Sequence, residues 1–101
     1  MANWKYRLKV GSDLREAISD ENYEDVLKYL EKAWREINKQ FPEDYEEDEL
    51  NEDIADIANE RDNLYYYEDY DMTYDDVIDN IDYLCNELYD FCDAERIWIE
   101  I

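Results

Sequence analysis

The chain has very few residues that make turns, with one glycine, Gly11, and one proline, Pro42, among 101 residues. Sandwiches and barrels of short strands need a turn signal about every ten residues, and glycine and proline supply most of those signals. Because so few are present, we expect helices to dominate. The length suits one domain, residues 1–101, with a single modest core.

Hydrophobic residues are frequent enough to build that core. They make up 46% of the chain, whereas disordered acidic tails are poor in them. No stretch approaches the ~20 apolar residues of a membrane span, and the first ten residues lack the apolar run of a signal peptide. We therefore expect no membrane association and a cytoplasmic protein, located in the host cell if a phage encodes it.

Both ends of the chain alternate with the period of two that is typical of β-strands. The apolar residues of this pattern are Trp4, Tyr6, Leu8 and Val10 near the N-terminus and Ile97, Ile99 and Ile101 near the C-terminus. We predict strands at about 3–10 and 96–101 that pair with each other. Two strands alone are marginally stable, so they must pack on the helices or be extended by a second protomer, as in a homodimer.

The N-terminal pattern also contains one basic stripe. It consists of Lys5, Arg7 and Lys9, which alternate with the apolar residues. We expect these side chains to pair across the sheet with acids such as Glu95 and Glu100.

Between the strands the apolar period changes to that of helices. We predict four helices, at about 13–20, 22–40, 45–65 and 73–93. The first is expected to begin near Ser12 or Asp13, and Asn22 is a candidate cap for the second. The spacing of Thr73 and Asp76 resembles a capping box before the fourth. The predicted fold class is therefore α+β and mainly helical.

The three longer helices each carry an apolar stripe that we expect to form the core. In the second helix the stripe is Tyr23, Val26, Leu27, Leu30, Ala33, Trp34 and Ile37. In the third it is Leu50, Ile54, Ile57, Ala58, Leu64 and Tyr65. In the fourth it is Val77, Ile78, Ile81, Leu84, Cys85, Leu88 and Phe91.

The residues needed for common catalytic sites are missing or badly placed. The chain contains no histidine, which excludes Cys-His, Ser-His and His-zinc chemistry. Cys85 and Cys92 lie seven residues apart on a predicted helix, roughly 10 Å, so we expect free thiols that face the core in a reducing compartment. Paired carboxylates occur, as in a glycosidase, but without pocket-forming loops. We predict that the protein is not an enzyme.

No metal site or cofactor is expected either. The segment 71–82 resembles a calcium loop only faintly, because it lacks a glycine at its sixth position and runs into the predicted fourth helix. Dense carboxylates associate weakly with divalent ions, but no dedicated site follows from this pattern.

The net charge of −21 is distributed very unevenly. Residues 1–40 contain eight basic and eight acidic side chains, whereas residues 41–101 contain two basic side chains, Arg61 and Arg96, and 23 acidic ones. Self-repulsion of this size costs stability, and solubility alone requires a charge of only about 2 to 8. The excess therefore favours a use in binding a basic partner.

Acidic residues recur at helical spacing on the two later helices. The row on the third helix is Glu46, Glu49, Asp53, Asp56 and Glu60, which we expect to lie opposite the apolar stripe. The row on the fourth is Asp75, Asp79, Asp82, Asp90 and Asp93, with Asn86 in the gap. Steps of three or four residues advance about 4.5 to 6 Å, comparable with the charge spacing of a nucleic-acid backbone. Phosphate mimicry is therefore geometrically feasible.

The alternative is that each row is an ordinary solvated face. Such faces usually mix Glu with Lys, because like charges at this spacing destabilise a helix, and these faces have almost no Lys. The fourth helix also uses Asp rather than Glu, despite the lower helix propensity of Asp. A short side chain fixes the position of its carboxylate, which favours the mimicry hypothesis.

Tyrosines are concentrated between these two helices, at Tyr65, Tyr66, Tyr67, Tyr70 and Tyr74, where they surround Glu68, Asp69 and Asp71. We expect Tyr65 and Tyr74 to pack in the core and the others to point outward. Exposed tyrosines are frequent at interface hot spots. Arginine pairs with carboxylates and stacks on aromatic rings, so an acidic patch with tyrosines suits an arginine-rich groove.

The predicted partner-binding surface combines both rows and the connection between them. Its residues are Glu46, Glu49, Asp53, Asp56, Glu60, Tyr67, Glu68, Asp69, Tyr70, Asp71, Asp75, Asp79 and Asp82.

With these acid rows and the connection EDYDMTYDD, the chain resembles the small acidic DNA-mimic proteins of phages and mobile elements, which include anti-CRISPR and anti-restriction inhibitors. The resemblance is one of size, charge and acid rows over residues 43–93. It implies stoichiometric inhibition, in which the acidic face fills the channel where a defence nuclease holds nucleic acid. That nuclease would be a restriction enzyme or a CRISPR effector such as Cas9, blocked at its PAM-reading or heteroduplex groove. The first forty residues would then be scaffold or a dimer interface.

Two other functions fit the same charge pattern. One is an immunity or antitoxin protein that neutralises a single basic nuclease toxin through the same electrostatic steering. The other is an acidic adaptor without mimicry. In each case the expected partner is a basic protein, and nucleic acid itself is not bound directly.

Overall fold

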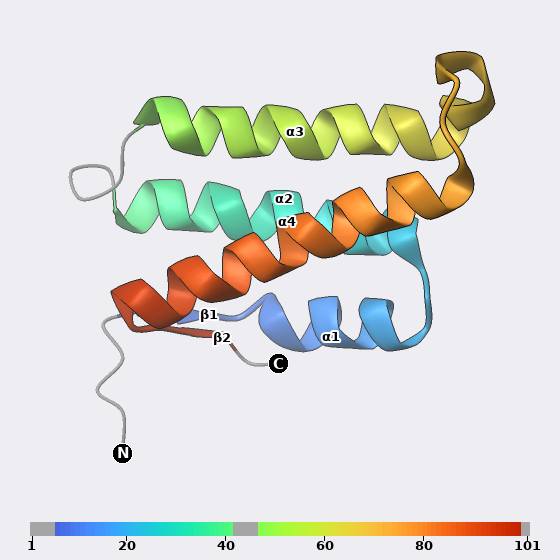
Figure 1. Ribbon diagram of the computed structural model, residues 1–101. Coiled ribbons are helices and arrows are strands. Elements are labelled where there is room, and N and C mark those ends of the chain that lie inside the picture. Colours follow the sequence, from blue (N-terminus) through green and yellow to red (C-terminus); the bar gives the residue numbers. More distant parts are fainter. Residues whose placement is uncertain (1–5, 42–46, 100–101) are drawn as a thin grey trace.

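In the computed structural model, which describes residues 6–41 and 47–99, the chain runs strand, four helices, strand (Figure 1). The elements are β1 (Tyr6–Leu8), α1 (Gly11–Ser19), α2 (Tyr23–Gln40), α3 (Glu47–Tyr66), the 3-10 turn η1 (Tyr67–Tyr70), α4 (Tyr74–Glu95) and β2 (Ile97–Ile99). The predicted mainly helical α+β class, with four helices between two terminal strands, is confirmed.

Two of the helices begin at the predicted caps. The Oδ1 atom of Asn22 accepts the backbone N–H of Asp25 at 3.4 Å, which caps α2. At α4, Thr73 Oγ1 accepts the N–H of Asp76, and Asp76 Oδ2 accepts the N–H of Thr73, both at 3.2 Å, which completes a capping box. α1 begins at Gly11, before the predicted Ser12 or Asp13, and Val10 precedes it without a side-chain cap.

The chain turns at helix ends with little help from glycine. Among the described residues, Glu21, Asp71 and Arg96 adopt a φ of 55°, a conformation that usually favours glycine. After α1, the N–H of Asn22 reaches the carbonyl of Ala17 at 3.0 Å and the N–H of Glu21 reaches Ile18 at 3.1 Å. These two bonds form a Schellman motif with Glu21 at its left-handed position.

The two strands form a small parallel sheet, with Tyr6 opposite Ile97, Arg7 opposite Trp98 and Leu8 opposite Ile99. Both strands are shorter than predicted, because Val10 already leads into α1 and Arg96 ends α4. The predicted strand positions at 3–5 and 100–101 lie outside the described residues.

The sheet packs on the helices, which is one of the two ways in which we expected a two-stranded sheet to be stabilised. Leu8, Ile97 and Ile99 are buried in the same core as the helices. The guanidinium of Arg7 lies over the ring of Trp98, 4.2 Å from its centroid. We expected carboxylate partners for the basic stripe. The contact between Arg7 and the Trp98 ring is one that the sequence did not predict. Lys5 and Glu100 lie outside the described residues.

α2 is the centre of the fold and lies between α1 and α3, with α4 crossing in front of it (Figure 1). Its predicted stripe is buried apart from the half-buried Tyr23. On α4 the buried residues are Val77, Ile81, Leu84, Cys85, Leu88 and Cys92, while Ile78 and Phe91 are half-buried. Both cysteines are free and buried, as predicted.

The packed elements form a flat body of 44 × 30 × 16 Å. In such a thin body, each helix has a face in contact with solvent. The acidic side chains lie mainly on these solvent-exposed faces. Among residues 6–41 and 47–99, no helix combines the length and apolar character needed to cross a membrane.

Candidate functional site

The predicted row on α4 is fully exposed. Asp75, Asp79, Asp82, Asn86, Asp90 and Asp93 all lie on the solvent side of the helix, opposite its buried stripe. α4 contains no lysine or arginine. At a rise of 1.5 Å per residue, the row extends over about 27 Å. It is a linear array of negative charge on a rigid helix.

Three basic side chains of the described part of the chain pair with acids outside this row. In the described part of the chain, Arg35 and Arg61 both pair with Glu31, and Lys39 pairs with Glu36. All three ion pairs end on α2. The Arg35 and Arg61 guanidinium groups hold the pKa of the Glu31 carboxyl below its usual value.

The predicted position of the row on α3 is wrong in one respect, since it does not lie opposite the apolar stripe. Asp53 is only 8% exposed and Glu60 is half-buried, whereas Glu49 and Asp56 are exposed. The reason is that α3 packs against both α2 and α4, so its buried face is wider than one stripe. Asn80 on α4 donates a hydrogen bond to Glu60 at 3.3 Å across this seam. Glu46 lies outside the described residues.

The α3 row instead lines a groove between α3 and α4. The groove residues are Glu49, Glu52, Asp53 and Asp56 on α3 and Tyr83 and Glu87 on α4. Burial and the neighbouring carboxylates of Asp53 and Asp56 raise the pKa of Glu87. Five acids therefore meet along this seam, which is a second concentration of negative charge beside the exposed row.

The tyrosine-rich connection differs from its prediction at three residues. Tyr65 and Tyr74, which we expected in the core, are exposed, whereas Tyr67 is half-buried and packs against the core. Tyr66 and Tyr70 are exposed as predicted. The rings of Tyr67 and Tyr74 meet at 5.8 Å between centroids because Tyr67 turns inward from η1. The acids of the connection, Glu68, Asp69 and Asp71, are all exposed.

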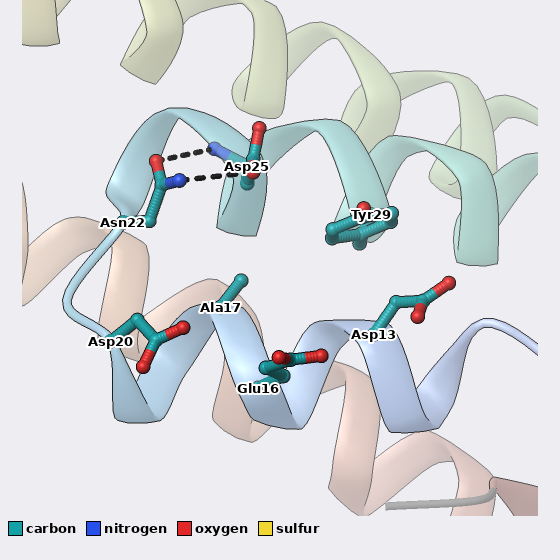
Figure 2. Close-up of a pocket in the computed structure, with 7 residues that line it drawn as sticks. All are labelled: Asp13, Glu16, Ala17, Asp20, Asn22, Asp25 and Tyr29. Atoms are coloured by element: carbon teal, nitrogen blue, oxygen red, sulfur yellow. Dashed lines mark hydrogen bonds between the residues drawn. The ribbon is translucent and has the colours of Figure 1, made fainter.

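A further acidic hollow, between α1 and α2, is absent from the sequence-based expectations (Figure 2). Asp13, Glu16 and Asp20 line it from α1, and Asp25 and Tyr29 line it from α2. The first forty residues have balanced charge in total, so their composition gave no sign of this grouping. Helical spacing of Asp13, Glu16 and Asp20 was the available signal.

Three basic residues of the same segment line a different hollow. Arg7, Lys9 and Lys32, together with Val10 and Glu36, line a separate hollow formed by the end of β1 and by α2. Part of the charge of the first forty residues is therefore separated in space, although Lys28 lies over the ring of Tyr29 beside the acidic hollow.

The described residues contain no group of three or more Cys, Asp or Glu side chains arranged to hold a metal ion. Comparison with protein-family models, curated proteins and solved structures finds no match to this chain.

Proposed function

We propose that the protein is a stoichiometric inhibitor that presents nucleic-acid-like charge and occupies the DNA- or RNA-binding site of a basic protein. The preferred target class is a defence nuclease, either a CRISPR effector such as Cas9 or a restriction enzyme. No catalytic step is part of the proposal, because the chain would act by occupying a site.

One observation supports the proposal most strongly, and it is the exposed aspartate row on α4 without any cation on that helix. The row from Asp75 to Asp93 spans about 27 Å, which corresponds to roughly eight base-pair steps of one strand at 3.4 Å each. Each carboxylate is held by a short side chain on a packed helix. A basic groove evolved for phosphates would find several negative charges at compatible spacing.

The groove between α3 and α4 adds to the same negative field. Its acids lie beside the row, since Glu87 belongs to α4 itself. A net charge of −21 attracts a basic partner over several ångströms and raises the association rate, with a strong dependence on salt.

The experiment is a capture from a host lysate on the immobilised protein, eluted with a salt gradient and repeated with excess duplex DNA as competitor. Beads carrying poly-glutamate of similar charge control for unspecific adsorption. The proposal expects a nuclease or another DNA-binding protein that elutes at higher salt than from the control beads, and that DNA displaces.

Two results contradict mimicry. A partner that stays bound in excess DNA, especially a single cognate toxin, would favour the immunity function instead. If the only captured proteins also bind poly-glutamate, the acidic surface attracts basic proteins without specificity.

A further inference from the structure

Four tyrosines form an exposed aromatic surface at one end of the helix bundle. Tyr65, Tyr66, Tyr70 and Tyr74, here called the tyrosine patch, have exposed fractions between 44% and 54%. They come from the last turn of α3, from η1 and from the first turn of α4, which meet at the same end (Figure 1).

The start of α2 holds the patch together. The hydroxyl of Tyr65 donates a hydrogen bond to Glu24, whose carboxylate raises the pKa of that tyrosine. The neighbouring residue, Tyr23, meets the ring of Tyr74 edge to face at 6.4 Å. Tyr65 also meets Tyr66 at 6.4 Å between centroids. Contacts with the start of α2 therefore orient Tyr65 and Tyr74, and Tyr66 packs against Tyr65.

Large aromatic side chains grouped on a surface usually mark an interaction site. These four have half of their area in water, although the core of the same protein buries Trp34 and Phe41 almost completely. Fixed tyrosines provide contact area with little loss of conformational entropy on binding. The patch is therefore suited to a partner surface.

The charges around the patch define the partner. Exposed carboxylates surround it, namely those of Glu21, Glu24, Glu68, Asp69, Asp71 and Asp75. The sequence contains no lysine or arginine between residues 62 and 95. Arg61, which pairs with Glu31, is the cation that acts on the patch, where it opposes the rise in the pKa of Tyr65. A cation that stacks on tyrosine and pairs with a carboxylate at the same time meets both features, and the planar guanidinium group does this better than an ammonium group. The protein itself contains such a contact, with Arg7 lying over Trp98.

We propose that the tyrosine patch is an arginine-binding surface, on which guanidinium groups of a basic protein stack while their N–H groups pair with the surrounding carboxylates. This inference rests on the proposed function, since it names the side chain that the basic partner places there. The aspartate row on α4 then provides long-range attraction, and the patch provides stacking contacts that favour arginine over lysine.

The test uses two synthetic peptides as probes, twelve residues long, with arginine or lysine alternating with serine. Binding is measured by fluorescence anisotropy of labelled peptides at about 0.3 M NaCl, where screening weakens unspecific attraction. The binding variant is Y66S/Y70S, which removes two exposed rings and leaves the charge unchanged. The matched control is W98S, which also leaves the charge unchanged, because Trp98 is 40% exposed but lies on β2, where Arg7 already covers its ring.

The wild-type protein is expected to bind the arginine peptide about fivefold more tightly than the lysine peptide, as stacking adds to ion pairing. Y66S/Y70S is expected to lower this ratio to about one, and W98S to preserve it. Equal affinity for both peptides in the wild type, or an equal loss in both variants, would overturn the inference. Mimicry is tested separately, by DNA competition. If the arginine preference is not observed but DNA displaces the partner, mimicry stands. If the preference is observed but DNA does not displace the partner, the arginine-binding surface stands.

Discussion

Asp53 on α3 and Glu87 on α4 line the same groove from opposite sides, although both are acidic and Asp53 is almost completely buried. Here the neighbouring carboxylates, together with burial, raise the pKa of Glu87. The fold thus keeps a destabilising concentration of charge, which is expected if the charge serves binding.

This relationship predicts the effect of Glu87→Gln. A raised pKa in the folded state means that the folded protein binds the proton more strongly than the unfolded chain. The resulting stability is present below the unfolded pKa and is lost as the pH rises through the folded pKa. Ionised Glu87 therefore costs stability at pH 7, and Glu87→Gln should raise the Tm there but progressively less toward acidic pH.

The control for this variant is Asp90→Asn, which removes one exposed charge from the same helix. Thermal unfolding followed by circular dichroism from pH 4 to pH 8 compares the two. An equal gain from both variants would show that only total charge matters and that the groove has no special role.

Added salt should raise the Tm of the wild-type protein. Acidic side chains on α3 and α4 far outnumber the one basic side chain in their sequences, Arg61. The screening length falls from about 10 Å at 0.1 M to about 3 Å at 1 M ionic strength. Repulsion should therefore weaken as NaCl is added. A Tm that falls between 0.05 M and 1 M NaCl would mean that internal ion pairs dominate, contrary to the open acid rows described above.

The left-handed turn at Glu21 predicts a stabilising substitution. Glycine avoids the steric cost of this conformation, so Glu21→Gly should be more stable than Glu21→Gln by about 1 kcal/mol, or roughly 5 °C in Tm. Both variants remove the same charge, so their difference isolates the backbone effect. Urea unfolding of the pair measures it, and indistinguishable midpoints would argue against strain at this position.

The two cysteines should be unreactive in the folded protein. Burial raises the pKa of Cys85 to about 12, with a further contribution from Asp82, and burial alone raises that of Cys92 to about 12. Thiolate is the reactive form, so a disulfide reagent at pH 8 should modify neither residue until urea unfolds the chain. Rapid modification without denaturant would show that α4 opens locally near these residues.

Sequence periodicity predicted most of the fold because the signals were local. The α2 stripe, the Asn22 cap and the Thr73 capping box depend on residues within one or two turns, and all three are confirmed. Helix number and order followed from the same signals. The parallel direction of the two strands depends on where the four helices between them bring the chain back to the sheet. Local sequence patterns do not contain this information.

The candidate site was less predictable, because it depends on which helices pack together. Asp53 lies on the expected row, but contact of α3 with two helices buries it. The sequence allows Tyr65 and Tyr74 to lie either in the core or on the surface, because tyrosine has both an apolar ring and a polar hydroxyl. In the structure both are exposed. The acidic hollow of Asp13 and Asp20 was hidden by the balanced charge of its segment.

The most direct test of the central claim compares two triple variants that change the net charge equally. D75N/D79N/D82N neutralises part of the α4 row, and D13N/E16Q/D20N neutralises the α1 side of the acidic hollow. Affinity for the nuclease captured in the DNA-competition experiment is measured for both over a range of NaCl concentrations. The account predicts that the α4 variant loses about tenfold in affinity with a shallower salt dependence, because fewer charges mimic phosphates, while the other variant changes by about twofold at most. Equal losses of affinity from both variants would contradict the account. They would mean that binding depends on the total negative charge and not on the position of the α4 row.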